Sequence, residues 1–208
     1  MKKFNFIIAG LILAIGFTAC SKDDTEYYDP EKYFTLEAPL LANYVDTAAG
    51  LENAILDEAS GIWYLVEEEG LTDPEDENFY EYNFNNVNQL EYPDIRVKYT
   101  GKLVANGFVF DQLDMNDSQY DGKYMRLMDL ILGWHYAFFP KEAIKKDGEM
   151  REIGGFTTLG LQQGSKIRVV IPSPWAYGNR SEPGKIPANS PLDFTIEVLV
   201  VKAPAPIN

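Results

Sequence analysis

The chain has 208 residues, of which 46% are hydrophobic and 13% aromatic, which allows one domain with a substantial core plus appendages. Its 18 lysine and arginine residues are outnumbered by 32 aspartate and glutamate residues, and the net charge of −14 disfavours nucleic acids and anionic membrane surfaces as partners. One cysteine, Cys20, excludes an internal disulfide, and one histidine, His135, makes a typical zinc site or a serine-histidine hydrolase a poor hypothesis. We therefore expect chemistry that depends on no metal and no cofactor.

The first residues of the chain have the pattern of a secretory signal peptide. Lys2 and Lys3 precede an apolar run over residues 6–17, and small residues follow that run. The run is too short to span a bilayer core of ~30 Å comfortably, and no later segment is long enough. We predict that residues 1–19 are a signal peptide.

The only cysteine lies where a lipoprotein signal peptide is cleaved. Residues 17–20 (Phe-Thr-Ala-Cys) are similar to a bacterial lipobox, and residues 21–24 (Ser-Lys-Asp-Asp) resemble the short acidic export tag of Bacteroidetes surface lipoproteins. This resemblance implies lipidation of Cys20, contact with the membrane only through that lipid, and an outer-membrane lipoprotein of the cell envelope, with or without exposure on the cell surface. The alternative is an ordinary signal peptide followed by an incidental cysteine.

The segment after the signal peptide divides into a tether and a helical extension. Residues 20–33 are polar, acidic and contain a proline, which predicts a flexible tether. Apolar residues recur at near-helical spacing between Thr35 and Leu56, so we expect one or two short helices, interrupted near Gly50, in an extension over residues 34–59. The main domain is then expected over residues 60–208.

The main domain begins with strands and a long acidic segment. β-Branched and aromatic residues over residues 60–68 predict a strand, and residues 95–99 predict another. Residues 71–90, rich in acidic and asparagine side chains, are interpreted as a solvated loop; a calcium loop is the weaker alternative because no glycine occupies its centre. Gly101 and Asn106-Gly107 indicate a turn before a strand that ends at residues 108–111.

Two further β-rich runs cover residues 167–171 and 194–201. The sequence contains no internal repeat. Five or so strands with little helix predict an α+β fold built on an antiparallel sheet.

Three separated motifs occur in one order along this domain. They are Val97–Leu103 with Asn106-Gly107 and Phe110-Asp111, then Leu130–Trp134, then Gly164–Lys166 with Val170–Pro172, Ala176–Gly178 and Ile186–Phe194. Together they resemble the FKBP-type peptidyl-prolyl isomerases, and the resemblance covers residues 60–202. It implies a twisted antiparallel sheet of about five strands wrapped around one short helix, with an N-terminal helical extension similar to that of FKBP-like lipoproteins.

The same resemblance implies a set of pocket residues. Side chains that match the catalytic positions of the family are Tyr99, Phe110, Asp111, Trp134, Tyr177 and Phe194. Side chains that match its substrate-contacting positions are Leu130, Ile131, Ile186 and, across an irregular spacing, Tyr124. In this scheme Trp134 supports the prolyl ring and the Tyr177 hydroxyl faces the substrate. Asp111 orients neighbouring polar groups such as Tyr99 and transfers no proton.

The sequence departs from the family pattern in two places. Trp134 and Gly164 are about twenty residues further apart than in the family, which implies an insertion near residues 139–160. An alternative alignment puts Gly155-Phe156 in place of Gly133-Trp134, but it leaves the helix too short. The stretch over residues 112–122 implies an unusual, acidic pocket rim.

Prolyl isomerisation suits a chain with so few reactive side chains. Rotation about a peptide C–N bond faces a barrier of ~18–20 kcal/mol, although the two X-Pro isomers differ by only ~0.5–1 kcal/mol. No bond breaks, and the twisted amide has less charge separation than the planar one, so a dry aromatic pocket favours the transition state. The resemblance thus implies an isomerase for proline-containing exported client proteins, with macrolides as candidate inhibitors.

Two other functions remain as alternatives. In the first, the same pocket grips a proline-bearing or other apolar ligand without catalysis, as a binding or chaperone module of a surface lipoprotein complex. In the second, a glycan-system accessory lipoprotein uses exposed aromatic side chains as sugar platforms. The presence of all six catalytic-type side chains favours catalysis, because a scaffold needs no such set.

Overall fold

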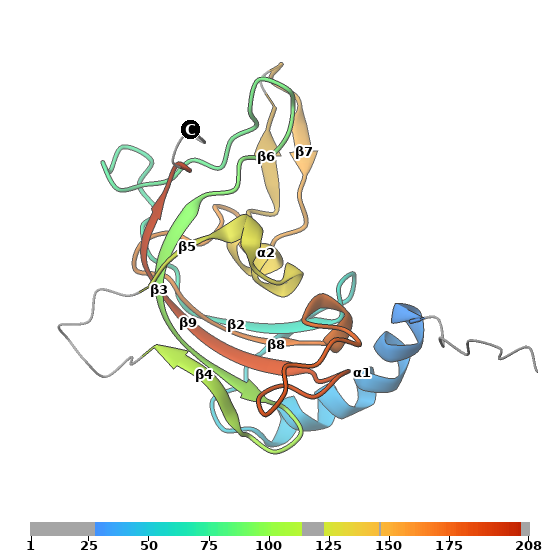
Figure 1. Cartoon of the computed structure of the whole chain (residues 1–208). Helices are drawn as coiled ribbons and strands as arrows, with labels where there is room; N and C mark the ends of the chain where they lie inside the picture. Colours follow the sequence, from blue (N-terminus) through green and yellow to red (C-terminus); the bar gives the residue numbers. More distant parts are fainter. Residues whose placement is uncertain (1–27, 114–122, 146, 205–208) are drawn as a thin grey trace, which may run out of the picture.

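The computed structural model describes residues 28–113, 123–145 and 147–204, and their strands form one large and one small antiparallel sheet (Figure 1). The elements are α1 (Pro30–Thr47), β1 (Ile55–Asp57), β2 (Ile62–Glu68), β3 (Asp94–Leu103), β4 (Val109–Leu113), β5 (Lys123–Arg126), the 3-10 turn η1 (Leu127–Asp129), α2 (Leu132–Phe138), β6 (Glu142–Ile144), β7 (Met150–Glu152), β8 (Lys166–Ile171), the 3-10 turn η2 (Ser173–Trp175) and β9 (Leu192–Lys202). The large sheet has the order β1-β2-β8-β9-β3-β4. Strands β5 and β4 pair with the first and second halves of β3, so both lie along the same edge.

Several predictions from the sequence concern residues that the structure does not describe. The predicted signal peptide, Cys20, most of the predicted tether and residues 114–122 of the predicted acidic rim lie outside the described residues. Within the described part, no helix is both long enough and apolar enough to cross a membrane.

The five strands expected from the sequence account for most of the large sheet. They correspond to β2, β3, β4, β8 and β9, and together with two helices they confirm the α+β fold. In β9, Phe194, Ile196 and Val198 face the core and alternate with polar residues, as a half-buried strand requires. Gly101 lies inside β3 opposite Phe194, so the turn that it was expected to form comes later, at residues 104–106.

The two helices cover opposite faces of the curved sheet (Figure 1). Helix α2 lies on the concave face, and its buried side chains share the main core with Ile167 and Ile171 of β8. Helix α1 packs on the other face, where Leu41 and Val45 contact Val170. Strand β8 is therefore buried on both sides, which explains why its sequence is a nearly continuous apolar run.

Helix α1 begins earlier than the sequence predicts. The Asp29 side chain accepts a hydrogen bond from the Glu31 N–H at 3.1 Å, and Pro30 occupies the first turn, both of which favour a helix start. The end of the predicted tether is therefore helical. Of the one or two helices expected before residue 59, only one is present: Ile55 and Leu56 pair with β2 as strand β1, and so short a helical pattern is weak in isolation.

The acidic segment over residues 71–90 is only partly the solvated loop that its composition predicts. Tyr80, Tyr82 and Phe84 are buried within it. Gln162 fixes the segment, because its side-chain amide donates to the Tyr80 carbonyl and accepts from the Tyr80 N–H, both at 2.9 Å. Burial of three aromatic rings outweighs the polar neighbours and binds this segment to the return loop of the insertion.

The insertion near residues 139–160 forms a hairpin and a return loop. Strands β6 and β7 pair with Glu142 opposite Glu152, and Figure 1 shows the hairpin standing beside the segment that connects β2 to β3. Gly155 packs directly on the backbone of Phe139, where a Cβ would come within 1.7 Å of a carbonyl oxygen. The insertion is thus fixed at its base by a contact that only glycine allows.

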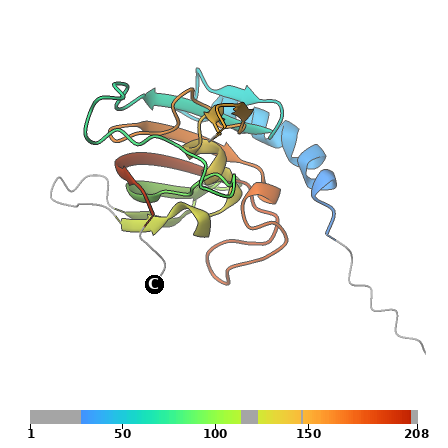
Figure 2. The same cartoon turned by 90° about the horizontal axis from the view of Figure 1, so that it is seen from above.

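A buried carboxylate joins α1 to the turn η2. Glu37 is 4% exposed and accepts hydrogen bonds from the Ser173 N–H at 2.7 Å and from the Ser173 hydroxyl at 2.5 Å. Figure 2 shows the N-terminal half of α1 passing beside this loop. The rings of Phe34 and Trp175 pack together with their centroids 5.1 Å apart. Burial raises the pKa of the Glu37 carboxyl, although the two bonds from Ser173 oppose that shift.

We predict that Glu37 makes the stability of the fold depend on pH in a defined direction. A raised pKa means that the folded chain binds this proton more tightly than the unfolded chain, so the stabilisation is complete below the ordinary pKa of 4.5 and is lost as the pH rises through the folded value. Urea unfolding gives the unfolding free energy of the protein and of Glu37→Gln. The value for the protein minus the value for the variant should therefore fall as the pH rises from 4 to 7.

The exposed Glu31 on the same helix supplies the control, because Glu31→Gln removes an equal charge without touching Ser173. A difference between the protein and Glu37→Gln that grows with pH would contradict the raised pKa.

Candidate functional site

The described residues enclose a cavity of about 410 Å³ at one end of α2, which we call the aromatic cavity. It is lined by Tyr99, Phe110, Asp111, Met125, Asp129, Leu130, Ile131, Leu132, Trp134, Pro174, Ala176, Tyr177, Arg180 and Phe194. These side chains come from β3, β4, β5, η1, α2, β9 and the loop around η2. All six catalytic-type residues expected from the sequence are among them.

The floor of the aromatic cavity is an indole held by other rings. Trp134 is 4% exposed, and the rings of Tyr99 and Phe194 each meet it nearly at right angles with centroids 5.4 Å away. Phe110 meets Phe194 in the same way at 5.6 Å. Edge-to-face contacts of this kind orient aromatic rings, so the four side chains form one preformed apolar surface.

Two glycines allow this close packing. A Cβ on Gly101 would lie 2.7 Å from ring atoms of both Phe110 and Phe194, and a Cβ on Gly133 would lie 2.6 Å from Ile171. Glycine inside a strand commonly marks such a close approach. Gly101 therefore lets the phenylalanine rings lie over β3, and Gly133 lets α2 carry Trp134 close to the sheet.

A hydrogen bond crosses the edge of the aromatic cavity. The Tyr99 hydroxyl donates to Asp111 Oδ2 at 2.6 Å, and the two residues lie on the neighbouring strands β3 and β4. A bond to a carboxylate is among the stronger hydrogen bonds of proteins. It fixes the Tyr99 ring beside Trp134 and agrees with the expectation that Asp111 orients Tyr99.

Tyr177 places a phenol at the opposite wall, just after η2. Burial raises the pKa of the Tyr177 hydroxyl, the nearby carboxylates of Glu182 and Asp111 raise it further, and Arg180 opposes them. The hydroxyl therefore keeps its proton throughout the neutral range and can donate a hydrogen bond into the cavity.

The substrate-contacting residues expected from the sequence are placed unequally. Leu130 and Ile131 line the aromatic cavity. Ile186 does not: it is 1% exposed and belongs to the main core. Tyr124 lies in β5 opposite Arg96, and its side chain is outside the described part of the structure.

Several lining residues were not expected from the sequence. They are Met125, Asp129, Leu132, Pro174, Ala176 and Arg180. Position gave the only usable signal, since each lies within three residues of a side chain that was expected to line the pocket. Asp129 and Arg180 put one charge of each sign among the lining residues.

The insertion leaves the aromatic cavity uncovered, because none of its described residues is part of the lining. Phe156, the residue that the alternative alignment puts in place of Trp134, stacks on Tyr64 with ring centroids 4.4 Å apart. The geometry therefore favours the alignment through Gly133-Trp134.

Across residues 28–113, 123–145 and 147–204, no group of three or more histidine, cysteine, aspartate or glutamate side chains could hold a metal ion. His135 lies on α2 with its Nε2 at 2.9 Å from the Leu127 carbonyl, and burial lowers its pKa. The arrangement can bind an apolar ring, exclude water from it and donate a hydrogen bond beside it.

Comparison with known proteins identifies similar chains. A family model described as FKBP-type peptidyl-prolyl cis-trans isomerase matches residues 146–199. FK506-binding protein 1 of Saccharomyces cerevisiae is 54% identical over 107 residues, which cover 51% of this chain and 75% of that protein. The FKBP-type peptidyl-prolyl cis-trans isomerase FkpA of Buchnera aphidicola is 38% identical over 109 residues, which cover 51% of this chain but only 34% of that protein.

Among solved structures, FkpA from Escherichia coli is similar with 22% sequence identity and a TM-score of 0.49, covering 84% of this chain and 62% of that one.

Proposed function

Because this chain belongs to the FKBP-type peptidyl-prolyl cis-trans isomerase family, we propose that its aromatic cavity catalyses cis–trans isomerisation of X-Pro bonds in client polypeptides. The observation that carries the proposal is the apolar surface of Tyr99, Phe110, Trp134 and Phe194, with the Tyr177 phenol at its edge. No titrating base, nucleophile or metal is needed for this reaction.

The cavity acts by changing the surroundings of the amide. A planar X-Pro amide has more charge separation than a twisted one, so water stabilises the ground state more than the transition state. An apolar cavity that takes up the prolyl ring removes part of that water. It therefore lowers the barrier by binding the twisted form better than the planar form.

The lining residues take different roles in this mechanism. Trp134 supports the prolyl ring, and Phe110 and Phe194 form walls beside it. The Tyr177 hydroxyl donates a hydrogen bond to a carbonyl of the substrate, and Asp111 is a positioning residue that acts through Tyr99. Leu130 and Ile131 contact the residues next to the proline, whereas Ile186 supports the core beneath the loop.

We predict that Trp134→Leu lowers kcat/KM for a short X-Pro peptide about 10- to 100-fold. Loss of most of a buried aromatic contact corresponds to about 1.5–3 kcal/mol of transition-state binding. A protease-coupled isomerisation assay measures the effect. Trp63→Leu is the matched control, because Trp63 packs against the α1 side of the sheet and should lose stability but not activity.

Equal activity of Trp134→Leu and the protein would contradict the assignment of the cavity. A protein that binds the peptide and does not accelerate its isomerisation would support the alternative of a non-catalytic binding module. Since the yeast relative is named an FK506-binding protein, we also propose FK506 as a competitor of the peptide in this assay.

We predict that Tyr177→Phe lowers kcat/KM about 2- to 10-fold. We also predict that kcat/KM of both the protein and the variant is independent of pH between pH 6 and pH 9. One hydrogen bond contributes about 0.5–1.5 kcal/mol, and the raised pKa keeps the Tyr177 proton in place over this range. Tyr64→Phe, which removes a hydroxyl outside the cavity, is the control. If the activity of the protein falls between pH 7 and pH 9 while that of Tyr177→Phe stays constant, the phenol titrates in this range. That result would refute the assignment.

We further propose that the chain is a lipoprotein of the cell envelope that meets its clients after export. Support comes from the basic residues Lys2 and Lys3, the apolar run over residues 6–17 and the small residues before Cys20. Stable anchoring by lipid takes more than one acyl chain, as lipoprotein processing provides.

We predict that labelled palmitate is incorporated into the chain in a bacterium that processes lipoproteins, and that Cys20→Ala abolishes the label. Cys20 is the only cysteine, so the variant identifies the site without ambiguity. The variant should also move from the membrane fraction to the soluble fraction. If the parent chain is not labelled, Cys20 is not lipidated and the proposed anchor is wrong.

A further inference from the structure

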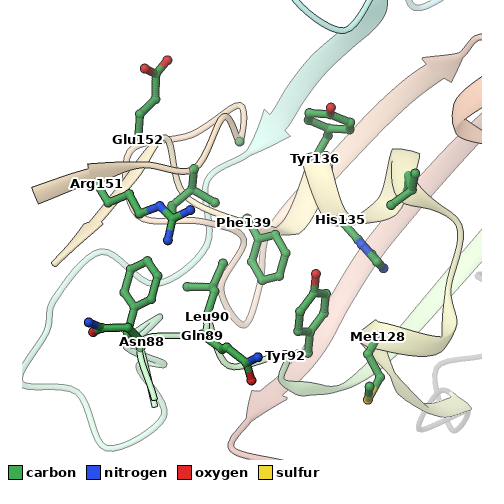
Figure 3. Close-up of a pocket in the computed structure, with 14 residues that line it drawn as sticks. Asn88, Gln89, Leu90, Tyr92, Met128, His135, Tyr136, Phe139, Arg151 and Glu152 are labelled. Atoms are coloured by element: carbon green, nitrogen blue, oxygen red, sulfur yellow. The ribbon is translucent and has the colours of Figure 1, made fainter. Parts of the chain in front are cut away.

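A second hollow of about 700 Å³ lies on the other side of α2, which we call the outer hollow (Figure 3). Its walls come from four places: the segment over residues 84–92, the turn η1, the helix α2 with Phe139 just after it, and residues 151–155 of the insertion. The outer hollow therefore exists because the insertion and the partly buried acidic segment stand against each other beside α2.

The floor of the outer hollow is aromatic and uncharged. The ring of Tyr92 meets those of His135 and Phe139 edge-on, with centroids 5.1 and 5.0 Å away. His135 donates through Nε2 to the Leu127 carbonyl at 2.9 Å, and burial lowers its pKa, so its ring is neutral at neutral pH. Such a floor suits a bulky apolar side chain.

The two hollows meet at the first turn of α2. At 3.6 residues per turn, Trp134 projects about 160° away from Tyr136, so Trp134 faces the aromatic cavity while Tyr136 faces the outer hollow. Phe139, just after the helix, also lines the outer hollow. Leu132 lines both hollows and is 47% exposed. Met128, in η1 beside it, lines only the outer hollow and is 50% exposed. The ridge between the hollows is therefore apolar and accessible.

We propose that the outer hollow is an accessory site for the client polypeptide, and that it binds a bulky apolar side chain of the same extended segment whose proline occupies the aromatic cavity. The proposal rests on the proposed function and adds a substrate class to it. The hollows are separated by about one helix diameter, ~10–12 Å, and an extended chain rises ~3.3 Å per residue. The anchoring side chain should thus lie three or four residues from the proline.

Arg151 adds a preference in charge. Its guanidinium lies 5.7 Å from the centroid of the Phe84 ring, and Figure 3 shows it directed into the hollow while the neighbouring Glu152 points away. Within the described residues Arg151 forms no ion pair. Glu152 is the other charged lining residue, and its carboxylate is directed away from the hollow. The Arg151 cation on the wall therefore favours an acidic residue next to the anchoring side chain.

The test compares peptides that share one X-Pro bond. The first is a tetrapeptide; the longer ones carry Phe-Glu, Phe-Lys or Ala-Ala four residues from the proline, on either side of it. Exchange spectroscopy gives kcat and KM for each without a coupling protease. We expect the Phe-Glu peptide, in one of its two orientations, to have a KM about 5- to 10-fold below that of the Ala-Ala peptide, as burial of one apolar side chain allows.

Two variants locate the effect. Met128→Glu should leave the tetrapeptide unaffected and remove most of the advantage of Phe-Glu, whereas Leu40→Glu, a substitution at a 61% exposed position of α1, should change neither. Arg151→Glu should reverse the preference in favour of Phe-Lys, which a misfolded variant cannot do.

The outcomes separate this proposal from the isomerase itself. Equal KM values for the Phe-Glu and Ala-Ala peptides in both orientations, with an active protein, would overturn the accessory site and leave the isomerase intact. A protein that is inactive on the tetrapeptide would overturn the isomerase. In that case the fluorescence anisotropy of the same labelled peptides still tests the accessory site. Tighter binding of the Phe-Glu peptide than of the Ala-Ala peptide supports the site, and equal binding refutes it.

Discussion

The proposed isomerase site depends on one constraint, which is that Trp134 must be held at the floor of an apolar cavity. The edge-on contacts of Tyr99 and Phe194 satisfy it, and Gly101 and Gly133 make those contacts possible by removing side chains where rings and helix approach the sheet. An isomerase that works by desolvation has no reactive group whose chemistry compensates for a loose pocket. Its rate therefore depends on how rigidly the apolar surface is preformed.

The extension before the main domain contributes to this rigidity from outside. Helix α1 packs on the convex face, and Glu37 fixes Ser173 at the start of the loop that brings Pro174 and Tyr177 to the cavity. The Arg168 guanidinium and the Tyr44 hydroxyl both bond to buried Asp193, so the same helix is also tied to the sheet. The Tyr177 phenol is thus positioned by a helix whose described residues do not line the cavity.

The sequence predicted the parts of the molecule whose burial follows a simple period or a known motif. Alternation identified the strands, and the three motifs identified Tyr99, Trp134 and Phe194 as neighbours. What failed depends on contacts between distant segments. The rings of residues 80–84 are buried by the insertion although their neighbours are polar, and Ile186 turns into the core because the loop folds back on itself through a pairing with Glu182. Neither effect leaves a local signal.

The position of the insertion relative to α2 explains why the chain has two separate hollows. Placed after the short helix α2, it leaves the aromatic cavity open and builds its own hollow on the opposite side of the helix. A seven-residue helix thereby presents Trp134 to one hollow and Tyr136 to the other, and Leu132 at its start lines both. A pocket that recognises little more than one prolyl ring binds weakly, because a small buried area yields little free energy. For the proposed client, a second apolar contact on the same helix raises affinity without altering the aromatic cavity.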